Sequence, residues 1–199
     1  HSRGHQWMIY GKAERMNRNL EVAIVIGHHP ALLLAAGTRF LPLGLDEFEV
    51  AGALLGEPID LVKCETIDLE VPASAEIVIE GEILAHVRED EGPFGEYTGY
   101  ASGRSTRNVI KVKAITHRKD AYYEDLMAGN SSEHLLLMGV PKQAIVFQRM
   151  RQVIPNIKQM NWPIPGVNLL CFVQLAEPVE DGQPHLAGTL LLGLDSYVK

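Results

Sequence analysis

Residues 67–83 read IDLEVPASAEIVIEGEI, and the alternation in this stretch decides the fold class. Apolar residues stand at every second position, namely Ile67, Leu69, Val71 and, after Pro72, Ile77, Ile79 and Ile83. Such alternation places apolar side chains on one face of a strand and polar side chains on the other. The stretch therefore predicts two strands, each with one face in solvent.

Four other runs predict further strands. LEVAIVIG at 20–27, bounded by Gly27, is typical of a buried strand, and NVIKVKAITH at 108–117 alternates. AIVFQ at 144–148 and NLLCFVQLA at 168–176 are additional candidates. The spacing of these runs is too irregular for a regular succession of strand, helix and strand. We therefore predict a mainly β fold with flanking helices, built as an antiparallel barrel or sandwich.

Two short helices are predicted between the strands. HHPALLLAAG at 28–37 has Pro30 in a first-turn position and Gly37 at its end. DEFEVAGALLG at 46–56 has Asp46 as its N-cap and Gly56 as its stop. The first 20 residues are polar and basic, and no element is predicted for them.

Composition excludes some classes of protein. The 199 residues carry 18 basic and 25 acidic side chains, a net charge of −7, which disfavours nucleic acid as a partner. No apolar run is long enough for a membrane span, and no signal peptide opens the chain. Cys64 and Cys171 stand in apolar runs, as small buried hydrophobes do, and fit a reducing cytoplasm. The chain begins at His1 and ends in an unfinished pattern, so we expect a fragment of a longer protein.

The segment EGPFGEYTGY at 91–100 is the densest candidate for chemistry. Glu91 and Glu96 are separated by Gly-Pro and Gly, so a folded loop can bring both carboxylates to one cavity. A carboxyl in an apolar pocket has a raised pKa and can donate a proton while its neighbour stays charged. The alternative is an acidic surface turn, because Glu89 and Asp90 extend the charge run.

Glu47 is a second candidate. It shares a helical face with Val50, Ala51 and Leu54, and a carboxylate buried on that face needs a cation or metal. The alternative places it on the helix rim beside Asp46, where the helix dipole favours an acid. No zinc-binding spacing, phosphate-binding glycine loop or nucleophile motif is present in the sequence.

Two motifs, DLEVPASAEIVIEGEI at 68–83 and EGPFGEYTGY at 91–100, resemble the central region of the UbiD family of prenylated-FMN-dependent decarboxylases. The likeness extends more loosely from His1 to the C-terminal end. It implies a flavin-reductase-like, FMN-binding split β-barrel. Residues 1–199 would then form a single middle domain of a longer chain.

The resemblance also assigns roles to residues. Glu96 matches the acid that protonates carbon after CO2 leaves, and Glu91 its partner in a Glu-Arg-Glu network whose arginine lies outside this chain. His1 and Glu47 match two ligands of a divalent metal, usually Mn2+, whose asparagine ligand also lies outside; a K+ ion is allowed as well. Thr38, Arg39 and Pro42 match a loop near the cofactor, and a plain surface connection is the alternative for that loop.

The function implied is the reversible, non-oxidative decarboxylation of an aromatic or α,β-unsaturated carboxylic acid with prenylated FMN. Such a carboxy-lyase would form homo-oligomers through domains absent here, and this chain alone would be inactive. Two alternatives stay open. One is a flavin-binding or assembly module without turnover, and the other is a flavin-reductase-like oxidoreductase.

Overall fold

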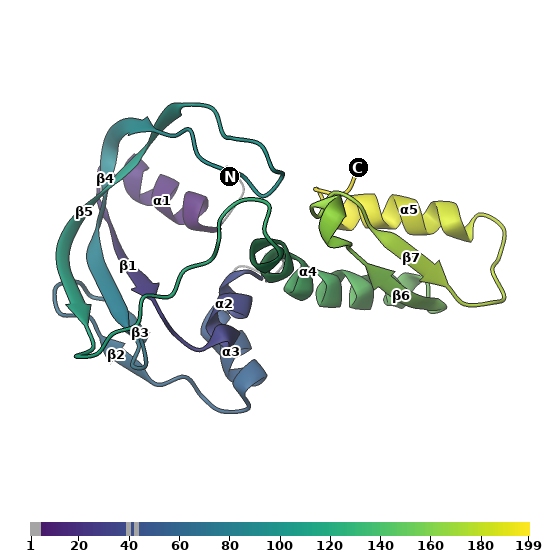
Figure 1. Cartoon of the computed structure of the whole chain (residues 1–199), viewed down its shortest axis with the longest axis horizontal. Helices are drawn as coiled ribbons and strands as arrows, with labels where there is room; N and C mark the ends of the chain where they lie inside the picture. The colour runs from purple at the N-terminus through teal and green to yellow at the C-terminus, as the bar shows by residue number, and fades with distance from the viewer. Residues whose placement is uncertain (1–4, 39–40, 42–43) are drawn as a thin grey trace. The chain divides into compact units, whose positions relative to one another are not determined.

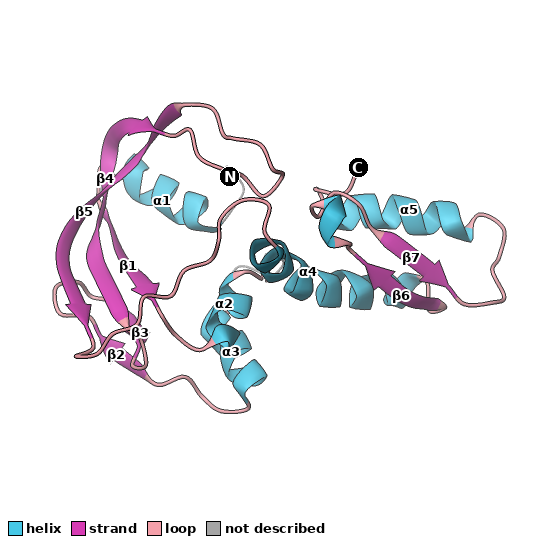
Figure 2. Cartoon of the chain, in the orientation of Figure 1, coloured by secondary structure: helices cyan, strands magenta, loops and turns pink. Residues whose placement is uncertain are grey.

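A computed structural model describes residues 5–38, 41 and 44–199. The chain forms two compact units, which are treated separately. Unit 1 comprises residues 1–32, 43–94 and 101–125, and unit 2 comprises residues 33–42, 95–100 and 126–199. Figure 1 follows the chain through both units, and Figure 2 shows that unit 1 holds the longest strands and unit 2 the longest helix.

Unit 1 is built on a three-stranded antiparallel sheet in the order β1–β4–β5. Its strands are β1 (Leu20–Ile26), β4 (Ile77–Glu91) and β5 (Ser105–His117). Helix α1 (His5–Arg15) lies on the concave side of this sheet (Figure 1). A small hairpin joins β2 (Leu61–Lys63) to β3 (Glu70–Pro72). The strands predicted at 20–27, 67–83 and 108–117 are thus confirmed, although 67–83 divides between β3 and β4. The predicted burial of the first strand is wrong, because the residues of β1 are half-buried or exposed.

Alternation determines which side chains share a face of the sheet. Ile24, Ile79 and Ile115 stand opposite one another across the three strands and form one apolar row. Glu80 points to the opposite face, since neighbouring residues of a strand alternate. Beside it the ladder shifts register at Gly81, where a Cβ atom would lie 2.5 Å from the Lys111 carbonyl oxygen. Glycine is therefore required at this close approach.

Glu80 is a buried carboxylate that binds the loop between β2 and β3. It is 1% exposed, and its two oxygens accept hydrogen bonds from Glu65 N (2.9 Å), Thr66 N (2.7 Å) and Thr66 Oγ1 (2.6 Å). Burial acts to raise the pKa of Glu80, but the hydrogen bonds from Thr66 and Glu65 outweigh it and hold the pKa below its ordinary value. The charged form therefore stabilises the folded state.

We expect Glu80→Gln to destabilise unit 1 by about 1–3 kcal/mol. The NH2 group of glutamine would replace one carboxylate oxygen, and it cannot accept the hydrogen bond that this oxygen accepts. The folded pKa is lowered, so the stabilisation is present above the unfolded carboxyl pKa and is lost as pH falls through the folded pKa. This loss of stability is measured by comparing amide hydrogen exchange of residues 64–69 at neutral and at acidic pH. Exposed Glu70→Gln is the control, and equal behaviour of the two variants would contradict the assignment.

Two further helices follow β1. Helix α2 (Pro30–Ala36) occupies the predicted stretch, and α3 (Glu47–Leu55) has the predicted caps. The Asp46 carboxylate accepts a hydrogen bond from Phe48 N at 2.9 Å, and Gly56 has a φ of 79° with its N–H bonded to Gly52 O. Local capping chemistry alone thus determines where α3 begins and ends.

Unit 2 packs a hairpin between helices. Helix α4 (Ser132–Val153) is followed by β6 (Ile157–Asn161), the short helix η1 (Ile164–Gly166), β7 (Phe172–Leu175) and α5 (Gln183–Leu194). Its core gathers Val146, Met150, Ile154, Ile157, Met160, Trp162, Ala187 and Leu191. Cys171 packs against this core, and burial raises the pKa of its thiol to about 11, which suits an unreactive side chain.

A buried ion pair ties α4 to the end of α5. Lys142 is 5% and Asp195 0% exposed, and Lys142 Nζ lies 2.9 Å from Asp195 Oδ2. The ammonium also lies 4.9 Å from the ring centroid of Trp162 and 5.9 Å from that of Tyr197. Asp195 Oδ1 accepts a hydrogen bond from Tyr197 N at 2.9 Å. The pair thus organises the residues that follow α5.

Several sequence predictions need correction. AIVFQ at 144–148 is not a strand but the middle of α4, and the strand expected at 168–176 covers only 172–175. The polar opening contains α1, for which no element was predicted. The strand-rich fold with flanking helices is confirmed, whereas the sheets formed by the described residues do not close into a barrel. The single domain over 1–199 stays a prediction.

Candidate functional site

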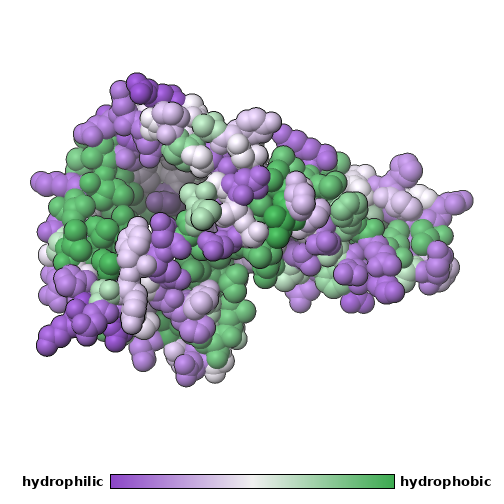
Figure 3. Space-filling model, in the orientation of Figure 1, coloured by the Kyte–Doolittle hydropathy of each residue, from purple (hydrophilic) through white to green (hydrophobic). Residues whose placement is uncertain are grey.

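Unit 1 contains a cleft between α1 and the sheet, of about 340 Å³. Its largely apolar lining residues are Trp7, Tyr10, Ile83 and Ile110. Its polar lining residues are Gln6, Glu91, Arg107 and Asn108. Figure 3 shows a hollow in unit 1 that is bordered by hydrophobic residues on one side and by more polar residues elsewhere. An apolar wall with a few polar groups is the usual composition of a small-molecule site.

Glu91 stands at the edge of this cleft. It is the last residue of β4, opposite Ser105 on β5, and its Oε2 lies 3.5 Å from Arg107 Nε. Arg107 in turn donates hydrogen bonds to Ser105 Oγ at 2.7 Å and to the Thr106 carbonyl oxygen at 2.9 Å. Both charged side chains are about half exposed, so the pair adds little to stability but presents an anion and a cation side by side.

A hydrogen-bonded network fixes the α1 wall of the cleft. Tyr10 donates to Glu14 Oε1 at 2.6 Å, and Arg88 donates to Tyr10 Oη at 2.9 Å and to Glu14 Oε1 at 2.8 Å. The hydrogen bond from Tyr10, more than those from His86 N and Arg88, lowers the pKa of Glu14 to about 2. Burial raises the pKa of Tyr10. Glu14 therefore stays ionised and Tyr10 protonated across physiological pH, which keeps the wall in one arrangement.

Glu96 lies in unit 2, in the turn 95–100. Its N–H donates to the Tyr100 carbonyl oxygen at 2.8 Å, and its own carbonyl oxygen accepts from Gly99 N at 2.9 Å. The side chain is half-buried. Glu91 and Glu96 thus belong to different compact units, and each is placed only within its own unit.

The predicted metal and cofactor residues are placed in part. Glu47 is half-buried in the first turn of α3 beside Asp46; Ala51 on its face is fully buried, but Leu54 is exposed, so the predicted burial of this face is wrong in part. Thr38 follows α2, and its hydroxyl donates to the Leu34 carbonyl oxygen at 2.9 Å. His1, Arg39 and Pro42 lie outside the described residues.

The lining of the unit 1 cleft fits a flat ring system such as a flavin. A flat ring system needs an apolar wall with polar groups at its edge, and the unit 1 cleft supplies both. Over residues 5–38, 41 and 44–199, no three histidine, cysteine or acidic side chains come together as metal ligands.

Sequence reasoning missed Arg107 and the network of Tyr10, Glu14 and Arg88. A signal for Arg107 existed, because the EGPFGE segment joins two strands of one hairpin and the residues after it must return beside Glu91. The network has no such signal, since 74 residues of chain separate Glu14 from Arg88.

The sequence is similar to a family model and to several decarboxylases. Residues 1–131 match the family model described as the UbiD 3-octaprenyl-4-hydroxybenzoate carboxy-lyase Rift-related domain. The chain is 40% identical over 146 residues to a phenolic acid decarboxylase of Bacillus subtilis (strain 168), covering 73% of this chain and 31% of that protein. It is 38% identical over 156 residues to an anhydromevalonate phosphate decarboxylase of Methanothermobacter thermautotrophicus, covering 78% and 36% respectively.

Solved structures agree with these sequence matches. The UbiD-class enzyme HmfF from Pelotomaculum thermopropionicum, solved as an evolved dimeric form with prenylated FMN, superposes with a TM-score of 0.94 and is 44% identical. The match covers 99% of this chain and 46% of that one. Apo 3,4-dihydroxybenzoic acid decarboxylase (AroY) from Klebsiella pneumoniae superposes with a TM-score of 0.89 at 31% identity, over 100% and 43% of the two chains.

The matches cover only part of each relative. The chain spans about a third of the length of the curated relatives named above and less than half of the solved chains. No helix among the described residues is long and apolar enough to cross a membrane. The family model nevertheless covers well over half of the sequence, and the chain belongs to the UbiD family.

Proposed function

We propose that the protein carrying this chain catalyses the reversible, non-oxidative decarboxylation of an aromatic or α,β-unsaturated carboxylic acid, using prenylated FMN. The observation that carries the proposal is the match to HmfF with prenylated FMN, which is 44% identical over 99% of this chain. The decarboxylases among the relatives support the same reaction class.

In the proposed reaction the protein orients the substrate and donates one proton to it. Prenylated FMN, when bound, supplies an electron sink for the departing carboxylate. As the bond to the carboxylate breaks and CO2 leaves, the carbon accepts a proton from the Glu96 carboxyl group, which later regains one from solvent. Carbon exchanges CO2 for a proton, so the reaction consumes no external oxidant or reductant.

Other residues have supporting roles in this proposal. Glu91 orients Glu96 through an arginine outside this chain, in a Glu-Arg-Glu network. Arg107, 3.5 Å from Glu91, holds the Glu91 carboxylate at the cleft edge. Thr38, Arg39 and Pro42 contact the cofactor, and His1 and Glu47 ligate Mn2+ or another divalent ion, with K+ as a further cation. We also propose that the protein is cytoplasmic, which the free thiols of Cys64 and Cys171 support, and that it forms homo-oligomers.

We expect native mass spectrometry of the intact protein, made with prenylated FMN and Mn2+, to show one cofactor and one metal for each chain. Glu47→Gln should lose the metal, because the amide carries no negative charge for a divalent cation. Exposed Glu49→Gln, on the same helix turn, is the control and should keep it. Retention of metal by Glu47→Gln would contradict the ligand role, and intact protein without flavin would contradict the proposed function.

A further inference from the structure

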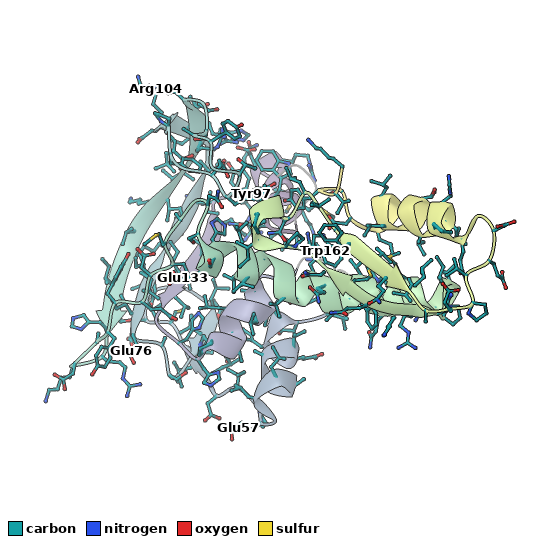
Figure 4. All side chains as sticks on the ribbon, turned by 45° about the vertical axis from the view of Figure 1, so that its right-hand side comes forward. Glu57, Glu76, Tyr97, Arg104, Glu133 and Trp162 are labelled. Atoms are coloured by element: carbon teal, nitrogen blue, oxygen red, sulfur yellow. The ribbon has the colours of Figure 1, made fainter. Side chains whose placement is uncertain are left out.

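The turn that carries Glu96 rests on two aromatic contacts of the next residue, Tyr97. The Tyr97 ring meets His134 edge-on, with centroids 6.3 Å apart and planes at 64°. It meets Tyr197 in the same way, with centroids 6.0 Å apart and planes at 77°. Edge-to-face pairs of this geometry contribute about 0.5–1.5 kcal/mol beyond the area they bury. Tyr97, which is labelled in Figure 4, therefore has aromatic contacts with two rings of unit 2.

Both partners of Tyr97 are themselves held in place. His134 lies in the first turn of α4, where its N–H donates to the N-cap Ser131 Oγ at 3.2 Å and its Nδ1 accepts from Gly129 N at 3.3 Å. Tyr197 is bound through its N–H to Asp195, which pairs with buried Lys142. The two aromatic contacts thus connect the turn to a capped helix start and to the buried ion pair.

The backbone of the turn lies against the segment that precedes α4. Gly99 has a φ of 84°, and a Cβ atom there would lie 3.4 Å from Asn130 Nδ2. A Cβ atom on buried Gly129 would lie 3.7 Å from the Glu96 carbonyl oxygen. The turn therefore lies close to this segment, and the two hydrogen bonds inside the turn hold the Glu96 backbone.

We propose that Tyr97 is a positioning residue. Its ring, which contacts His134 and Tyr197, fixes the direction in which the Glu96 carboxyl group points. The inference rests on the proposed function, in which Glu96 is the proton donor. Proton transfer requires donor and acceptor atoms about 2.6–3.2 Å apart, and a displacement of about 1 Å can cost on the order of a hundredfold in rate. A residue that fixes Glu96 therefore affects turnover without touching substrate.

The test compares Tyr97→Leu with Tyr97→Phe in the intact, cofactor-loaded protein. Leucine removes both edge contacts, so we expect kcat to fall on the order of 10–100-fold while KM changes less than about twofold. Phenylalanine keeps the ring and should restore most of kcat. Tyr100→Leu is the matched control, since Tyr100 is in the same turn but 79% exposed, and its kcat should stay near the parent value.

A second measurement isolates the proton step. Exchange of the product's C–H hydrogen for deuterium in D2O requires proton transfer without loss of CO2, and Tyr97→Leu should slow it as much as it slows turnover. If Tyr97→Leu does not fold, His134→Leu removes one of the two contacts and should lower kcat severalfold. Cofactor content is measured for every variant.

The outcomes separate this inference from the proposed function. Intact, cofactor-loaded protein that releases no CO2 from aromatic or α,β-unsaturated acids would overturn the proposed function, and Glu96→Gln with full activity would overturn the proton-donor role of Glu96. An inactive Glu96→Gln beside an unaffected Tyr97→Leu would overturn only the positioning role. Equal damage from Tyr97→Phe and Tyr97→Leu, or a parallel loss of kcat, KM and cofactor content, would also overturn it, because ring contacts would then not set the Glu96 direction.

Discussion

Glu96→Gln in the intact, cofactor-loaded protein should lower kcat by about 10²–10⁴-fold, the usual contribution of a positioned general acid. Glutamine has nearly the same shape and keeps a hydrogen-bonding side chain, so the turn 95–100 should stay folded. What it lacks is an ionisable proton for the carbon that loses CO2. Initial rates of CO2 release, with the substrate dissociation constant measured separately, test this expectation.

A carboxylate six residues earlier in the sequence provides the control for Glu96. Asp90 is exposed near the end of β4, adjoining Glu91, and faces Thr106 across the ladder. Asp90→Asn removes the same charge from the same acidic run and should leave kcat within about twofold of the parent. Equal rates for Glu96→Gln and the parent would contradict the proton-donor role of Glu96.

Breaking the buried ion pair of unit 2 should have the largest effect on stability. Lys142→Met or Asp195→Ala leaves one buried charge without its partner, which costs about 3–5 kcal/mol. Amide hydrogen exchange in α4 and α5 of the intact protein measures the loss, and we expect it to accelerate by at least about a hundredfold. The methionine keeps the apolar stem beside Trp162, so lost packing contributes little.

Two comparisons test whether charge causes this effect. The double variant Lys142→Met/Asp195→Leu removes both charges and should recover much of the stability, because no uncompensated charge remains. Lys63→Met breaks the exposed pair with Asp68, whose side chains are 75% and 90% exposed, and should cost at most about 1 kcal/mol. If Lys142→Met were no more damaging than Lys63→Met, the pair would not hold α4 to α5.

The elements that sequence predicted well depend on local chemistry. Helix α3 is determined by Asp46 and Gly56 within a few residues, and β4 and β5 by alternation along each strand. The strand prediction at 144–148 was wrong because a short stretch with β-branched and aromatic residues fits a buried helix as well as a strand. The N-cap Ser131 and the continuous packing of Val146 and Met150 decide the outcome, and both depend on residues outside the run.

The site was harder to predict because its contacts join distant parts of the chain. Motifs identified Glu91 and Glu96 as candidates, since they stand five residues apart in one distinctive segment. Lys142 and Asp195, by contrast, are 53 residues apart, and neither lies in a recognisable pattern. Only the fold shows that Tyr97, between two anchored rings, differs from exposed Tyr100.

The outer strand of unit 1 also bears on how the protein behaves at high concentration. In the sheet that the described residues form, β5 is an edge strand that carries exposed Val112 and Ile115. Lys111 and Lys113 flank Val112 on the other face of the strand. A second molecule that paired with this edge would meet Lys111 and Lys113, and lysines on an edge strand oppose the edge-to-edge pairing from which aggregates grow.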